Sequence, residues 1–146
     1  MDDGPRNCSV ARTLEVVGDR WSLLVIREAL LGAHRFDQMQ RGTGAPRDIL
    51  AARLRKLVET GVLERRRYQE RPPRFEYHLT EAGRDLHPVI TALRQWGDHH
   101  VTSPEPRPLR FEHACGGHSP AALVCPDCGE PVAAGSYRRE EPAPAA

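Results

Sequence analysis

The chain has 146 residues, of which 39% are hydrophobic and 28% are charged, and its formal net charge is +1. This is the length of one domain with a short extension, and no apolar run approaches the roughly 20 residues that a membrane span needs. The stretch MDDGPRN at the start is acidic and has no apolar core, so we expect no secretory signal. We therefore expect a cytoplasmic protein, in which the cysteines are thiols or metal ligands rather than disulfides.

The charged residues are unevenly distributed along the chain. Between Arg41 and Arg74, ten basic residues accompany four acidic ones, so this segment carries +6 and the remainder carries −5. A basic segment in a nearly neutral chain is typical of a surface that binds phosphates. An arginine-rich solvated face has the same composition, so charge alone leaves both interpretations open.

Two helices are expected before residue 33. Apolar residues spaced three and four apart predict the first helix over Cys8–Val17, which Gly18 ends. The second helix follows Asp19, whose carboxylate can accept hydrogen bonds from the N–H groups of the first turn, and Gly32 ends it. Its sequence, RWSLLVIREALLG, is apolar on nearly all sides, which predicts a central position in a small core.

A helix, a turn and a second helix follow. RFDQMQ (35–40) predicts a short helix, and RGTGA (41–45) predicts a turn. The next helix is expected over Pro46–Thr60, because proline suits the first helical position and Gly61 can end the helix. One face of this helix is apolar. Its exposed side carries Arg47, Asp48, Ala51, Ala52 and Arg55.

A β-hairpin is expected after the second of these helices. VLERRRY (62–68) and RFEYHL (74–79) predict its two strands, and the second strand alternates Phe75, Tyr77 and Leu79 with polar residues. The two prolines in QERPPR (69–74) prevent regular pairing and stiffen the tip. An arginine flanks the prolines on each side.

One more helix should complete the domain. It is expected to begin at Thr80, to run through Trp96, and to be kinked at Pro88, because the proline ring clashes with the preceding turn. A second copy of the chain could cover its apolar stripe. Composition then predicts a linker over residues 102–110 and a disordered tail over 138–146. Residues 1–7 form an N-terminal tail.

This order of elements predicts a winged helix-turn-helix domain over residues 8–101, mainly α-helical with a β-hairpin wing. In such domains a helix enters the major groove of DNA, and the wing lies along the backbone or the minor groove. The stretches CSVARTLEVVGDRWSLLVIREALLG, RFDQM and ILAARLRKLVETGVLERRRYQERPPRFEYHLTEAGRDLHPVITALRQWG resemble the HxlR-type transcriptional regulators, which are relatives of the MarR regulators. The resemblance implies a repressor, a homodimer built by the first and last helices, and a near-palindromic operator. It also implies a response to oxidants or small molecules.

The resemblance also assigns residues, with Pro46–Thr60 as the recognition helix. Relatives often begin this helix with Gly-Ile-Ser, whereas this chain lacks the hydroxyl and has Gly44, Ala45 and Pro46. Any single arginine could instead form a surface ion pair. The residues expected to face base edges are Arg47, Asp48, Ala51, Ala52 and Arg55. Those expected to contact phosphates are Arg53 and Lys56 on the helix and Arg71 and Arg74 on the wing.

Cys8 lies where this family sometimes carries an oxidant-sensing thiol. A helix N-terminus lowers the pKa of a thiol and favours the reactive thiolate. The alternative, which we favour at this point, is a small buried residue at the dimer interface.

The segment HACGGHSPAALVCPDCG (113–129) holds three of the four cysteines and lies in a Cys/His extension over residues 111–137. CPDCG has the pattern of a zinc knuckle, and His-Ala-Cys-Gly is the matching half. Because structural zinc takes four N or S ligands, the predicted set is His113, Cys115, Cys125 and Cys128, with His118 as the alternative fourth ligand. We expect a closed structural site, while a redox-switchable one stays open. A thioredoxin-like motif lacks its βαβ context, and the deaminase pattern is not matched.

The sequence contains no further catalytic constellation, so we expect that the protein is not an enzyme. Two other hypotheses stay open. One is a protein-interaction adaptor that uses the winged fold and the zinc tail without specific DNA binding. The other is an enzyme that uses the thiols of the extension. DNA binding that weakens steeply with salt would distinguish a regulator from the adaptor, and metal content would test the enzyme.

Overall fold

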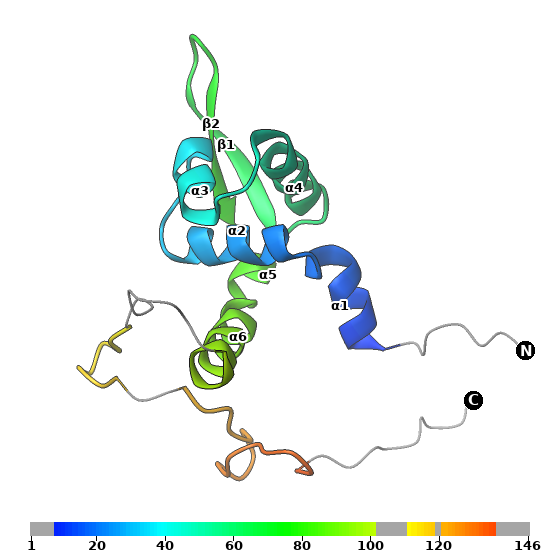
Figure 1. The fold of residues 1–146 in the computed structure, drawn as a ribbon, viewed down its shortest axis with the longest axis vertical. Helices are drawn as coiled ribbons and strands as arrows, with labels where there is room; N and C mark the ends of the chain where they lie inside the picture. The colour runs from blue at the N-terminus through cyan, green and yellow to red at the C-terminus, as the bar shows by residue number, and fades with distance from the viewer. Residues whose placement is uncertain (1–7, 102–110, 119–120, 137–146) are drawn as a thin grey trace, which may run out of the picture. The chain divides into compact units, whose positions relative to one another are not determined.

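The computed structural model describes residues 8–101, 111–118 and 121–136. The predicted N-terminal tail, linker and C-terminal tail therefore lie outside the described residues. The chain divides into two units, Met1–Arg94 and Gln95–Ala146, and no helix in the described part is long and apolar enough to cross a membrane. The elements in chain order (Figure 1) are α1 (Ser9–Val17), α2 (Arg20–Leu30), α3 (Phe36–Thr43), α4 (Arg47–Glu59), β1 (Leu63–Gln69), β2 (Arg74–Leu79), α5 (Glu81–Arg84) and α6 (His87–His100).

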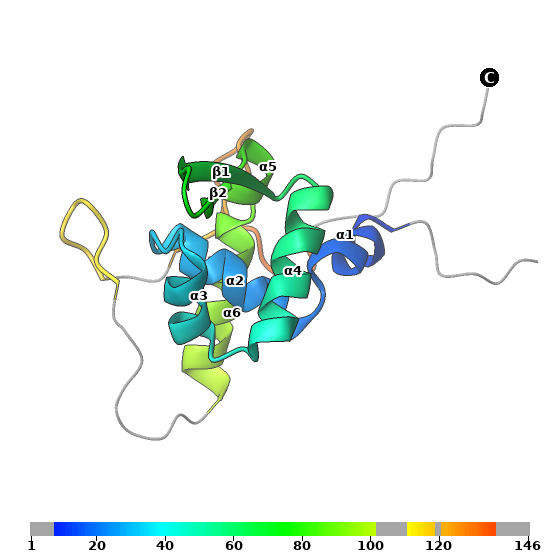
Figure 2. The same ribbon diagram turned by 90° about the horizontal axis from the view of Figure 1, so that it is seen from above.

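Helix α2 is the centre of the first unit, as its apolar sequence predicts. Val25 and Ile26 are fully buried, and Figure 2 shows α2 between α3 and α4. The carboxylate of Asp19 caps the helix, because Oδ1 accepts hydrogen bonds from the N–H groups of Trp21 at 3.1 Å and Ser22 at 3.0 Å. Desolvation raises the pKa of Asp19, but hydrogen bonds from Ser22, the charge of Arg53 and the N–H of Trp21 outweigh it and lower the pKa overall.

Helix α3 is longer than the sequence predicts. The expected turn over residues 41–45 is wrong in its first half, because α3 continues through Thr43 and the left-handed Gly44 (φ 69°) ends it. Gly42 is helical and faces the carboxylate of Glu28, which lies where a Cβ atom would be. The glycine therefore marks a close approach between two helices, and the turn itself is shorter than RGTGA.

Helix α4 packs against α2 through an apolar face, as predicted. Pro46 is the extended residue before the helix (φ −54°, ψ 144°) rather than its first residue, so α4 begins one position later than expected. The left-handed Gly61 (φ 75°) follows the helix end. The fully buried residues of the helix are Leu50, Leu54 and Leu57.

The predicted hairpin is formed by β1 and β2, which pair antiparallel with Leu63 opposite Leu79. Tyr77 and Leu79 pack against the core, as expected for the apolar face of β2. The N–H group of Tyr77 donates to the carbonyl oxygen of His34 at 2.7 Å. This bond ties the hairpin to the segment before α3, so the wing has a fixed base beside the helix-turn-helix.

The expected single last helix is wrong, because the structure has two helices there. Thr80 does cap the first of them, α5, since its Oγ1 accepts from the N–H group of Gly83 at 3.1 Å. A turn at residues 85–86 then separates α5 from α6. Pro88 has no N–H group to donate to the carbonyl of Arg84, and its ring would clash with that carbonyl in a continuous helix. The chain therefore begins a new helix instead of bending an existing one.

Candidate nucleic-acid interface

The outer face of α4 carries the side chains predicted to face base edges. Arg47, Asp48, Ala52 and Arg55 are exposed, and Ala51 is half-buried. The guanidinium of Arg47 lies over the ring of Phe36 at 4.9 Å, which orients it at the N-terminal end of the helix. Arg55 has no hydrogen-bond or ion-pair partner within the described part of the chain. On this face the small side chains of Ala51 and Ala52 lie between Arg47 and Arg55, so the helix backbone can approach a flat ligand closely.

The two cations predicted to contact phosphates from α4 have partners within the protein. Arg53 is only 32% exposed, and its Nε lies 3.2 Å from Oδ1 of Asp19, the residue that caps α2. The Nζ of Lys56 donates to the carbonyl oxygen of Glu15 near the end of α1 at 2.7 Å. Both side chains fix neighbouring helices to α4, and a phosphate contact would require them to leave these partners.

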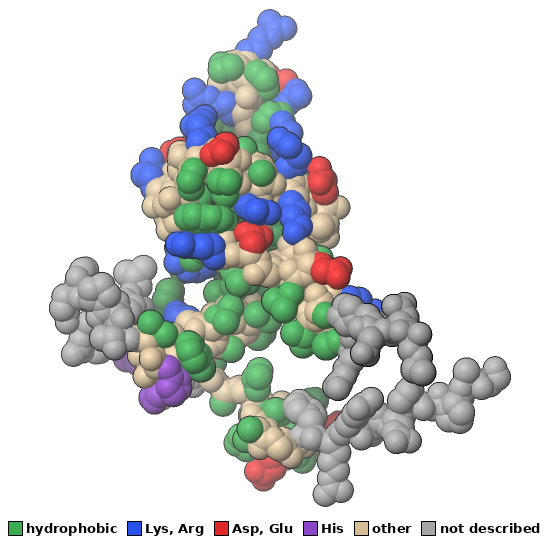
Figure 3. Space-filling model, turned by 45° about the vertical axis from the view of Figure 1, so that its right-hand side comes forward, with side chains coloured by type: hydrophobic (Ala, Val, Ile, Leu, Met, Phe, Trp, Pro, Cys, Tyr) green, Lys and Arg blue, Asp and Glu red, His purple; other side chains and the backbone are tan. Residues whose placement is uncertain are grey.

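The wing presents a row of arginines (Figure 3). Arg71 and Arg74 at the tip are exposed, and neither side chain has a partner among the described residues. Behind the tip, the guanidinium of Arg65 covers the ring of Phe75 at 3.5 Å. Arg67 pairs with Glu70 at 3.0 Å, so its charge is partly compensated. The wing therefore offers its uncompensated cations at its end.

One arginine that the sequence does not indicate connects the helix-turn-helix with the wing. The Nε of Arg35, just before α3, lies 3.2 Å from Oε1 of Glu76 on β2, and its guanidinium covers the ring of Tyr68 at 4.5 Å. Hydrogen bonds from His78 and Arg35 lower the pKa of Glu76. Because the two partners are far apart in the sequence, no local pattern indicates this contact.

Cys8 precedes α1 and is exposed in the single chain. Hydrogen bonds from the backbone N–H groups of Ala11 and Val10 lower the pKa of its thiol, and the charge of Arg12 acts in the same direction. The position therefore has the chemistry of an accessible thiol at a helix N-terminus.

The Cys/His extension contains two pairs of predicted zinc ligands. The Nδ1 atom of His113 lies 3.2 Å from Sγ of Cys115. Hydrogen bonds from the backbone N–H groups of Cys128 and Asp127, followed by one from the Cys128 side chain, lower the pKa of Cys125. Within residues 8–101, 111–118 and 121–136, no three His, Cys, Asp or Glu side chains lie together in a way that could hold a metal ion. The described residues thus contain two pairs of predicted ligands and no group of three.

A helix-turn-helix with an exposed second helix and an arginine-rich hairpin at its side defines a winged helix-turn-helix DNA-binding domain. Comparison with known proteins agrees with this class. The family model described as HxlR-like helix-turn-helix matches residues 16–105. The uncharacterized HTH-type transcriptional regulator Rv3095 of Mycobacterium tuberculosis is 50% identical over 127 residues, which cover 86% of this chain and 80% of that protein.

Two solved structures show the same similarity. The crystal structure of PA1607 has a TM-score of 0.81 and 38% identity, and it covers 94% of this chain and 96% of its own. The redox regulator HypR in its oxidized form has a TM-score of 0.60 and 32% identity, and it covers 66% of this chain and all of its own. The chain belongs to the HxlR-like helix-turn-helix family. It is a DNA-binding transcriptional regulator rather than an enzyme, which confirms the resemblance seen in its sequence.

Proposed function

We propose that the protein is a dimeric repressor that binds a near-palindromic operator with α4 in the major groove and the wing on the adjacent backbone. The observation that carries this proposal is the outer face of α4. Arg47, Ala51 and Arg55 are spaced four residues apart, so they share one side of the helix, and Arg55 has no partner in the part of the chain that is described. A free guanidinium beside small side chains suits the O6 and N7 atoms of guanine in the major groove.

The dimer is supported by apolar side chains that the single chain leaves in water. On α1, Val10 and Leu14 are exposed, and on α6, Val89, Leu93 and Trp96 are exposed. The three α6 residues are spaced four and three apart, so they form one stripe. Contiguous exposed apolar surface of this kind marks an interaction site. A second copy of the chain, related by a two-fold axis, would cover the stripe and present two α4 helices to two half-sites.

An oxidant is proposed to regulate DNA binding through the thiol of Cys8. The thiol is exposed and its pKa is lowered by the N-terminus of α1, and a similar protein, HypR, is named a redox regulator. We expect diamide to change the operator affinity of the parent protein and to leave that of Cys8→Ser unchanged, as measured by fluorescence anisotropy. Asp98→Lys is the matched control, because it changes an exposed residue and leaves every cysteine in place, and it should respond like the parent. An equal diamide response in Cys8→Ser and the parent would exclude Cys8 as the sensing thiol.

The function is tested by a salt series of anisotropy titrations with duplex DNA from upstream of the protein's own gene and with a shuffled duplex. We expect tighter binding to the native duplex, and a logarithmic affinity that falls with logarithmic salt by about 0.9 for each phosphate contacted. Equal binding to both duplexes that is insensitive to salt would contradict the proposal and favour the protein-interaction adaptor.

A further inference from the structure

The described residues between 111 and 136 form local structure without a hydrophobic core. Not one of them is buried, and Leu123 and Val124 are 62% and 54% exposed. Even so, the chain makes a small hairpin there, in which Val132 donates its N–H to the carbonyl of Leu123 at 2.8 Å, and Val124 bridges to Pro131. A single two-stranded hairpin is marginally stable in water at best. Something other than apolar packing is therefore needed to hold this segment.

The end of this hairpin has the geometry of a metal-binding knuckle. Cys125 donates its N–H to the carbonyl of Glu130 at 2.9 Å, and Gly129 donates back to the carbonyl of Cys125 at 2.8 Å. Gly129 adopts a left-handed conformation (φ 73°), which turns the chain sharply after Cys128. The backbone thus folds into a tight turn that carries both Cys125 and Cys128.

The second pair of predicted ligands, His113 and Cys115, lies on a separate tight loop. Gly116 donates its N–H to the carbonyl of His113 at 2.8 Å, and His113 donates to the carbonyl of Gly117 at 2.9 Å. This loop holds an imidazole nitrogen of His113 3.2 Å from the sulfur of Cys115. A Cβ atom on Gly117 would lie 3.3 Å from the same sulfur, so the glycine keeps the space beside it open. The loop thus presents one nitrogen and one sulfur ligand together.

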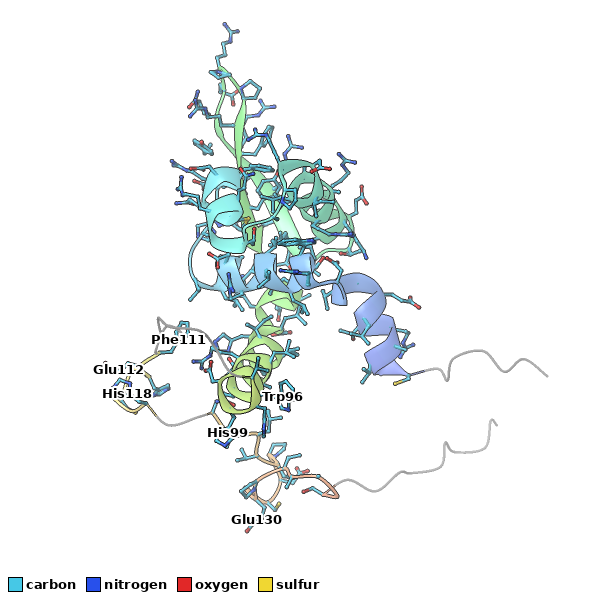
Figure 4. The ribbon with its side chains drawn as sticks, viewed as in Figure 1. Trp96, His99, Phe111, Glu112, His118 and Glu130 are labelled. Atoms are coloured by element: carbon cyan, nitrogen blue, oxygen red, sulfur yellow. The ribbon has the colours of Figure 1, made fainter. Side chains whose placement is uncertain are left out.

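The structure distinguishes the two histidines that compete for the fourth position. His118 lies on the same loop, but its Nε2 is 4.0 Å from a carboxylate oxygen of Glu112 (Figure 4). His113, in contrast, contacts the sulfur of Cys115 directly, and the N–H group of Cys115 also approaches its ring at 3.3 Å. In the structure, His113 is therefore the histidine in contact with Cys115.

We propose that His113, Cys115, Cys125 and Cys128 bind one zinc ion as a closed tetrahedral site, and that this ion takes the place of a hydrophobic core in residues 111–136. Three thiolates and one imidazole form a Cys₃His set, which zinc prefers in structural sites. Each thiol releases its proton to solvent as it binds. Because no three His, Cys, Asp or Glu side chains of the described residues lie together as a metal site, we expect metal binding to be coupled to the convergence of the two pairs, as in other small domains that fold around zinc.

The test is metal binding by the full-length chain, without DNA. Protein purified under reducing conditions is expected to contain one zinc per chain by atomic emission. After removal of zinc with a chelator, titrated Co(II) should give the strong visible absorption of a tetrahedral thiolate site and saturate at one equivalent, and added zinc should displace it. Metal-free protein is expected to lose amide protection from hydrogen exchange in residues 111–136 and to keep it in α2 and α4.

Matched variants identify the ligands. Cys115→Ser, Cys125→Ser, Cys128→Ser and His113→Ala are each expected to lose stoichiometric zinc, while Cys8→Ser and His118→Ala retain it. The helical circular dichroism of every variant checks that the winged domain is folded. A parent protein with less than a tenth of an equivalent of zinc and no tetrahedral Co(II) spectrum would overturn the proposal. Half an equivalent that depends only on Cys125 and Cys128 would also overturn it, because that result indicates an ion shared by two chains.

Discussion

Replacing Leu93 by glutamate is expected to convert the proposed dimer into a monomer and to lower its operator affinity by about 10²–10⁴-fold, the range by which linking two binding modules raises affinity. Leu93 is 50% exposed in the single chain and lies between Val89 and Trp96 in the apolar stripe of α6. A carboxylate placed there would be buried without a partner in the dimer, at a cost of several kcal/mol. In the monomer it would stay in water, so the fold itself should be kept.

Light scattering during gel filtration measures the change of mass, and thermal unfolding followed by circular dichroism checks the fold. Asp98→Lys is the matched control, because it changes charge at an exposed position on the opposite side of the same helix, half a turn from the stripe. We expect this variant to be a dimer with parental affinity. A Leu93→Glu protein that is still dimeric, or a monomer that binds the operator as tightly as the parent, would show that α6 does not form the proposed interface.

Most helices of the first unit could be predicted from the sequence, because residues only a few positions away set where these helices begin and end. Asp19 caps α2 with N–H groups two and three residues away. Gly18 follows α1 where a Cβ atom would clash with the carbonyl of Leu14, and Gly32 follows α2 with a left-handed φ of 89°. Each effect is local, so the sequence alone indicates it. The apolar periodicity of α4 predicts one apolar face, and the structure buries Leu50, Leu54 and Leu57 on it.

The sequence does not predict local structure or side-chain contacts where a residue far along the chain determines them. Gly42 looks like a turn residue, but Glu28 from another helix occupies the space beside it, so glycine is needed inside α3. The sequence also does not indicate that the side chain of Lys56, a predicted phosphate contact, donates to a carbonyl 41 residues earlier in the chain. No local pattern encodes such tertiary contacts. The proposed zinc ligands show the same limit, since their spacing indicates two pairs of donors but not how the two pairs come together.

Arg55 and Arg53 both lie on α4, but the structure gives them different surroundings. Arg55 is exposed without a partner among the described residues, whereas Arg53 is held by Asp19 at the start of α2. Arg55→Ala is therefore expected to reduce discrimination at one base pair of each half-site by about 1–3 kcal/mol, the worth of an arginine that reads guanine. Its binding to a shuffled duplex should change little, and its unfolding temperature should equal that of the parent.

Arg53→Ala is the matched comparison, because it also removes an arginine side chain from α4, two residues from Arg55. Its effect should fall on stability, with a loss of about 1 kcal/mol or less for a partly exposed ion pair, while its preference for the operator over a mutated half-site stays parental. Anisotropy titrations of both variants against a set of single-base operator mutants, together with urea unfolding, measure the two effects separately. If Arg53→Ala instead reduces the salt slope by about one with unchanged stability, Arg53 leaves Asp19 to bind a phosphate, as the sequence predicts. If Arg55→Ala keeps parental discrimination at every position, then α4 reads the operator without Arg55, and Arg47 becomes the residue to test.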